Sequence, residues 1–339
     1  MSRETVLVTG GAGFIGSELV RQLVARGDRV VVVDNLVNGR RENLAGLPPG
    51  QVTLVESDIR ALDGLRSRLR EARVVYHLAC LGVRHSVHSP VENHDVNATA
   101  TLHLLAACRE AEVPKFVYVS SSEVYGTALW APMAEEHPTS PCTVYGAAKL
   151  AGESYARAFF RTYRYPTVIV RPFNTYGPRS HHEGDSGEVI PRFLLRCLAR
   201  RPMVVFGDGT QTRDFTFVED TARGIMLAGT VEAAVGGTLN LGSGTEVSIN
   251  DLAALVATVT GFAPDVVHDT ARPGDVSRLC SDVSRAKSML GYAARVPLRA
   301  GLARLLEWYR AHHQSADELL RDEVVHNWEM KGAAAGPTA

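Results

Sequence analysis

Short apolar runs alternate with longer stretches of helical periodicity through the first half of the chain. The runs are uninterrupted, as is typical of strands that are buried on both faces of a parallel sheet. They cover residues 5–9, 30–33, 52–55, 74–78, 116–119 and 167–170, and stretches at 17–26, 93–110 and 145–163 have helical spacing. Strands separated by helices predict an α/β fold with a Rossmann-type, doubly wound parallel sheet.

The first apolar run leads directly into the glycine-rich turn Gly10-Gly11-Ala12-Gly13-Phe14-Ile15-Gly16. Glycines permit a tight turn and let the backbone approach a pyrophosphate, which meets free N–H groups at the positive end of a helix dipole. Asp34 ends the next run, where a carboxylate accepts hydrogen bonds from an adenosine ribose and repels a 2′-phosphate. The sequence therefore predicts NAD, and not NADP, as cofactor.

The strand–helix rhythm loosens after residue 178, which predicts a second, smaller unit. We expect an NAD-binding Rossmann domain at 1–178, to which 224–245 returns, and a substrate-binding α/β domain. The expected substrate domain comprises 179–223 and 246–330, with helices at 188–200, 250–260 and 298–312. Residues 331–339 are rich in small side chains, which predicts a disordered tail.

Charge and composition narrow the function classes. The net charge is −1, from 36 basic and 37 acidic residues, so no field of one sign favours nucleic acid or an anionic membrane. The apolar runs are too short to span a bilayer, and none resembles a signal peptide. Five scattered cysteines indicate reduced thiols, so we expect a cytoplasmic protein. His181-His182-Glu183 has no partner cluster at ligand spacing, so no metal is expected.

Tyr145 and Lys149 are the candidate chemistry, because residues four apart lie on one helix face. A lysine ammonium close to a phenol lowers the phenol's pKa and makes it a usable base near neutral pH. The spacing alone is common in helices. Ser121, Glu123 and Asn174 follow the ends of two other predicted strands, and ligands bind at the carboxyl ends of such strands. We therefore expect these five residues to share one site.

Six segments resemble, in order, the extended short-chain dehydrogenase/reductases, and the pattern is similar to nucleotide-sugar epimerases and dehydratases over nearly the whole chain. The segments are Thr9–Gly16, Tyr145-x-x-x-Lys149, Arg171–Pro178, Gln211–Phe215, Asn240–Gly244 and Arg272–Asp275. This resemblance implies a nucleotide-diphosphate sugar as substrate. It also implies a homodimer formed through the helices at 93–110 and 145–163.

The resemblance also implies residue roles. Tyr145 would take the proton of the sugar C4 hydroxyl as hydride leaves C4 for NAD, while Lys149 holds the nicotinamide ribose and Ser121 bonds the same sugar oxygen. The residues expected to line NAD are Gly10, Gly13, Phe14, Ile15, Gly16, Asp34, Asn35, Asp58, Ile59, Leu78, Ala79, Tyr145, Lys149 and Pro172. Those expected to contact the substrate are His85, Ser121, Ser122, Glu123, Asn174, Arg213 and Arg278, the last three at the diphosphate. His85, in the loop after the fourth strand, is alternatively a surface histidine.

A C4 ketone opens three routes, and Glu123 bears on the choice. On an extended segment Glu123 points the same way as Ser121, and a buried carboxylate exchanges protons readily. Dehydratases and uronate decarboxylases resemble this chain in having Glu there, although Ser122 stands where deoxythymidine-type dehydratases have Asp. These residues predict a 4,6-dehydratase, a lyase, with Tyr145, Lys149, Ser121, Glu123 and Ser122 as catalytic residues. The alternatives are a UDP-sugar-type 4-epimerase, then a UDP-uronate decarboxylase, and a non-catalytic NAD-binding scaffold.

Overall fold

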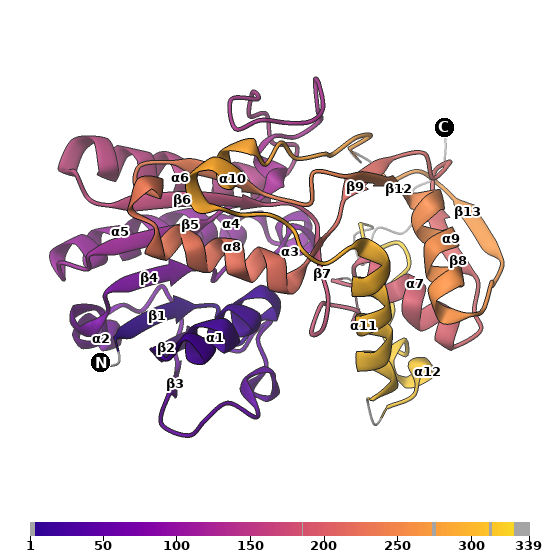
Figure 1. Cartoon of the computed structure of the whole chain (residues 1–339), viewed down its shortest axis with the longest axis horizontal. Coiled ribbons are helices and arrows are strands. Elements are labelled where there is room, and N and C mark those ends of the chain that lie inside the picture. The colour runs from indigo at the N-terminus through magenta and orange to yellow at the C-terminus, as the bar shows by residue number, and fades with distance from the viewer. Residues whose placement is uncertain (1–3, 185, 273–275, 312–313, 329–339) are drawn as a thin grey trace.

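The computed structural model describes residues 4–184, 186–272, 276–311 and 314–328. The expected tail at 331–339 lies outside these ranges. The structure consists of a large sheet covered by helices and a smaller unit beside it (Figure 1).

Seven parallel strands form the main sheet in the order β11-β6-β5-β4-β1-β2-β3. Their bounds are β1 (Thr5–Thr9), β2 (Arg29–Asp34), β3 (Val52–Glu56), β4 (Val74–His77), β5 (Lys115–Val119), β6 (Thr167–Pro172) and β11 (Thr238–Leu241). The order reverses between β1 and β4, and ligands bind at such a reversal beyond the carboxyl ends of the strands. The predicted doubly wound parallel sheet is confirmed.

Helices cover both faces of the sheet and create two apolar cores. One core packs β-strand valines against α1 (Phe14–Arg26), α8 (Val218–Thr230) and α10 (Ser284–Leu290). The other packs the opposite face against α2 (Arg66–Glu71), α5 (Ala100–Glu110) and α6 (Val144–Tyr163). The strands are buried on both sides, which is why their sequences read as continuous apolar runs.

The smaller unit has its own core and three two-stranded sheets. Its helices are α7 (Val189–Leu198), α9 (Ile249–Thr260), α11 (Leu298–Arg310) and α12 (Ala316–Leu319). The sheets pair β7 (Thr175–Tyr176) with β10 (Thr216–Phe217), β8 (Met203–Phe206) with β13 (Val266–Asp269), and β9 (Thr212–Asp214) with β12 (Glu246–Ser248). The carboxyl end of the main sheet faces this unit (Figure 1).

Two local expectations were wrong, at His85 and at Ser121. His85 lies not in a loop but in the short helix α3 (Val83–His88), which Gly82 begins. The helix expected at 93–110 is confirmed, with one irregularity: α4 (Pro90–His94) continues through a π-helical turn at Asp95–Thr99 into α5. Ser121 does not begin an extended segment. Its Oγ accepts the Glu123 amide at 3.2 Å and caps a 3₁₀ turn at Ser122–Val124, because a serine side chain competes for nearby backbone donors.

Candidate active site

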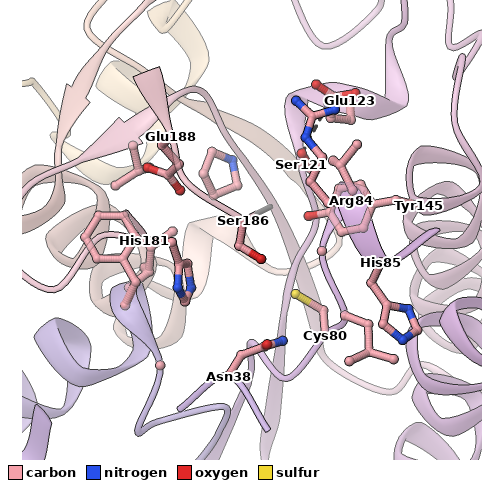
Figure 2. Close-up of a pocket in the computed structure, with 18 of the residues that line it drawn as sticks. Asn38, Cys80, Arg84, His85, Ser121, Glu123, Tyr145, His181, Ser186 and Glu188 are labelled. Atoms are coloured by element: carbon pink, nitrogen blue, oxygen red, sulfur yellow. Dashed lines mark hydrogen bonds between the residues drawn. The ribbon is translucent and has the colours of Figure 1, made fainter. Parts of the chain in front are cut away.

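A cavity of about 730 Å³ lies between the carboxyl end of the main sheet and the smaller unit. Figure 2 shows Tyr145, Ser121 and Cys80 on one side of it and His181 and Glu188 on the other. All the residues expected to line the cofactor lie in its wall, and so does every expected substrate residue except Arg278.

The glycine turn leaves the start of α1 open to the cavity. Gly10 has a φ of +70°, and a Cβ at Gly16 would collide with the Gly10 carbonyl, so both positions require glycine. Gly13 is the N-cap residue of α1, and no side chain caps its first N–H groups. These donors and the helix dipole suit a pyrophosphate, so the residues present fit a dinucleotide.

Asp34 is positioned by the backbone beside this turn. Its carboxylate is only 7% exposed, and it accepts the amides of Ala12 and Leu36, each at 2.9 Å. Each oxygen keeps further lone pairs, which suits the two hydroxyls of an adenosine ribose. Nearby, hydrogen bonds from Arg60 hold the pKa of Asp58 at about 2, so Asp58 is ionised near neutral pH.

We expect Asp34→Ala to weaken NAD binding roughly ten- to a hundredfold, because hydrogen bonds to a charged group contribute about 1.5–3 kcal/mol. Titration of the apoprotein with NAD measures the change. Asp208→Ala, which removes an exposed carboxylate in the smaller unit, is the control. Unchanged NAD affinity in Asp34→Ala would contradict the assigned ribose contact.

Tyr145 is half-buried at the start of α6, whose N-cap Thr143 accepts the Gly146 amide at 3.1 Å. Gly146 lets this turn approach the Glu123 backbone, since a Cβ there would lie 2.8 Å from the Glu123 carbonyl oxygen. Lys149, one turn on, donates to the Val119 carbonyl at 2.9 Å. Its ammonium is 5.8 Å from the centre of the Tyr145 ring.

The pKa of Tyr145 moves opposite to the expected direction. Burial raises it well above its ordinary value, and the Cys80 thiol and the Glu123 carboxylate raise it further, while a hydrogen bond with Ser121 lowers it. The expectation from Lys149 left out this burial, which disfavours the phenolate. Cys80 was missed as a site residue. Its place directly after the β4 region was the available signal.

The residues expected at the diphosphate are only partly brought together. Asn174 lines the cavity, and its amide oxygen is buried without a hydrogen-bond partner among the described residues. Arg213 also lines it and donates to the Val276 carbonyl at 2.7 Å. Arg278 is absent from the described lining and binds the Glu246 carboxylate with two nitrogens. Arg272, which was not predicted, lines the cavity instead.

Glu183 forms ion pairs both within the His181-His182-Glu183 segment and with Arg40. The carboxylate of Glu183 pairs with Arg40 and lies 3.8 Å from the His181 ring, and its hydrogen bond with His181 raises the pKa of that histidine. Burial raises the pKa of nearby Glu188 to about 7. Among the described residues, no group of three or more histidine, cysteine, aspartate or glutamate side chains is arranged to hold a metal ion.

Residues 6–242 match the NAD dependent epimerase/dehydratase family. The chain belongs to this family. It is 34% identical to a putative UDP-glucose 4-epimerase of Methanocaldococcus jannaschii, over 91% of this chain and 100% of that one. It is also 34% identical to UDP-glucuronic acid decarboxylase 1 of Arabidopsis thaliana, over 93% of this chain and 72% of the relative.

Among solved structures, the dTDP-glucose 4,6-dehydratase DesIV of Streptomyces venezuelae, crystallised with NAD, superposes with a TM-score of 0.84 at 33% identity. The alignment covers 90% of this chain and 97% of DesIV. These similarities identify an NAD-dependent enzyme family of the extended short-chain dehydrogenase/reductase type and confirm the predicted cofactor. The relatives catalyse different reactions, so the family does not decide between them. No helix in the described ranges is long and apolar enough to cross a membrane.

Proposed function

We propose that the protein is an NAD-dependent 4-epimerase of a nucleotide-diphosphate sugar. The observation that carries this proposal is the placement of Tyr145, Lys149 and Ser121 together in the wall of a cavity that continues into the dinucleotide cradle. The end-to-end match to a relative named as a putative UDP-glucose 4-epimerase supports it.

The side chains divide the work at C4. Tyr145 takes the hydroxyl proton, and Ser121 holds the same sugar oxygen while its charge changes. Lys149 is anchored on the Val119 carbonyl, which leaves other N–H donors of its ammonium for the nicotinamide ribose and for the phenolate as it forms. Bound NAD supplies the acceptor for the C4 hydride and its return.

Epimerisation needs no further acid or base at C5 or C6. The ketone has only to turn over in the cavity and take hydride back on its other face. Tyr145, Lys149 and Ser121 suffice for this, and all three line the cavity. The sequence-based choice of dehydratase rested on the resemblance at Glu123 and on an extended Ser121–Glu123 segment, and the 3₁₀ turn at Ser122–Val124 removes the second of these supports.

A 4,6-dehydratase is the second candidate, because the charge of Glu123 acts on Tyr145 within the same cavity. Such an enzyme needs a base at C5 and an acid for the leaving C6 hydroxyl. Ser122, which is 5% exposed, offers a hydroxyl where a second carboxyl group would serve as acid. Glu123 would therefore have to perform both proton transfers.

The two reactions are separated by product mass. We expect the NAD-loaded protein to convert at least one sugar in a panel of UDP-, dTDP- and GDP-sugars without any change of mass, with NMR showing inverted C4. The epimerase activity of Glu123→Gln should stay within about tenfold of that of the unchanged protein, because epimerisation requires no proton transfer by Glu123. Glu92→Gln, a lining carboxylate on α4, is the control.

Loss of water from the sugar, abolished by Glu123→Gln, would replace this proposal by dehydration. Loss of carbon dioxide from a UDP-uronate would indicate a decarboxylase. NAD binding without turnover of any sugar would leave the scaffold interpretation. The expected cytoplasmic homodimer stays a prediction.

A further inference from the structure

The last described stretch of the chain, residues 320–328, folds back onto the cavity. We call it the C-terminal strap. Glu323 and Val325 of the strap are part of the cavity wall. The same wall includes five apolar or aromatic side chains of the smaller unit, namely Phe193, Val204, Phe206, Phe215 and Ile249.

Four contacts hold the strap in place. The Val324 amide donates to the Gly184 carbonyl at 3.1 Å, and the Glu323 carboxylate accepts two hydrogen bonds from Arg196, at 3.0 and 2.9 Å. His326 lies 2.9 Å from the Asp269 carboxylate. The Trp328 ring meets Phe206 edge-on, with 4.7 Å between ring centres. The strap is thus bonded to the α7 region, to β8 and to β13.

The part of the cavity wall that includes the C-terminal strap has side chains suited to binding a nucleobase. Phe206 and Val325 are surfaces on which an aromatic base can pack. The Gln211 amide nitrogen donates to the Phe206 carbonyl at 2.8 Å, which fixes the orientation of that amide in the wall. The Glu323 carboxylate is paired with Arg196, so its charge is compensated next to an anionic ligand.

The other parts of the cavity are already assigned. The glycine turn and Asp34 form the dinucleotide cradle. In the proposed function the reacting sugar lies beside Tyr145, and Asn174 and Arg213 bind the diphosphate. A nucleotide sugar placed in this way has only its nucleoside left to bind. We propose that the C-terminal strap completes the nucleoside site of this enzyme and makes nucleoside affinity depend on residues 320–328. This inference rests on the proposed nucleotide-sugar substrate.

Truncation tests the proposal by binding alone. UDP, dTDP, GDP and ADP are titrated calorimetrically into the intact chain, and the tightest of them serves as the probe, with inorganic pyrophosphate and NAD as references. For a chain that ends at Leu319, we expect the probe to bind at least about tenfold more weakly, because several buried contacts are lost together. Pyrophosphate and NAD affinities should change less than twofold. A chain that ends at Trp328 is the matched control and should bind the probe like the intact chain.

Point variants keep the test decisive if the shorter chain does not fold. Val325→Trp places a larger side chain in the cavity and should weaken binding of the probe at least as much as truncation. Asp317→Asn, at an exposed ion pair with Arg201, should not weaken it. Equal probe affinity in the intact chain, the Leu319 truncation and Val325→Trp would overturn the strap proposal alone. An intact chain that binds pyrophosphate and NAD but none of the four nucleotides would overturn the nucleotide-sugar function as well.

Discussion

Tyr145→Phe should lower kcat by roughly 10²–10⁴-fold, the usual contribution of a general base. The phenol lies in the same cavity as Ser121 and Lys149, and the substitution removes only its oxygen. NAD affinity and the melting temperature should stay close to those of the unchanged protein. Steady-state kinetics with the sugar identified in the substrate panel measures the effect. Phe at 145 with more than a tenth of the original kcat would mean that another group takes the proton.

The raised pKa of Tyr145 predicts the direction in which kcat/KM changes with pH. Tyr145 acts as a base in its ionised form, and burial raises its pKa well above the ordinary value, so kcat/KM should rise with pH. Ser121→Ala removes the hydrogen bond that lowers this pKa, and should move the rise to higher pH. Cys80→Ala removes a group that raises it, and should move the rise to lower pH. Equal shifts in both variants would point to a general structural effect.

Arg171→Met should destabilise the fold by about 3–5 kcal/mol, the cost of leaving one partner of a buried ion pair without the other. Arg171 and Glu153 are 2% and 0% exposed in their side chains, and two hydrogen bonds of 2.8 and 2.7 Å join them behind the site. Urea unfolding measures the loss. Arg157, the outer partner of the same carboxylate, supplies the control, since Arg157→Gln leaves Glu153 paired.

Two further measurements separate charge from packing at this pair. Combining Arg171→Met with Glu153→Leu should recover much of the stability, because no charge then remains buried. Although burial pushes the pKa of Glu153 upward, its hydrogen bonds from Arg171 hold it below the ordinary value. Its contribution is therefore present above the unfolded pKa and is lost as pH falls through the folded one. A double variant less stable than Arg171→Met would show that shape, and not charge, dominates.

The dinucleotide half of the site was predictable from local sequence. Gly10, Gly16 and Asp34 belong to one strand–turn–helix–strand unit, so their relative positions are set by local structure and not by contacts with distant segments. The pairing of Tyr145 with Ser121 was reached differently, from the rule that parallel strands end at one edge of the sheet. Both groups of residues line the cavity, since neither placement depends on a long loop.

The substrate half was less predictable, because its geometry depends on contacts between distant segments. Arg278 was expected at the diphosphate but pairs with Glu246 on β12, and Arg272 stands in the wall instead. The Ser121 hydroxyl turned a supposed extended segment into a 3₁₀ turn. No spacing in the sequence reveals that Glu323 reaches Arg196 across the cavity end.

By itself, the sequence determined the parallel sheet and the NAD cradle and predicted Tyr145 as the base, because periodicity and short motifs act within single elements. The tertiary structure alone decided the environment of that base. Tyr145 and Lys149 have helical spacing, but the raised pKa of Tyr145 comes from burial and from Cys80 and Glu123, which belong to other elements. Desolvation and charge act through space, so they follow from packing and cannot be read from residue order.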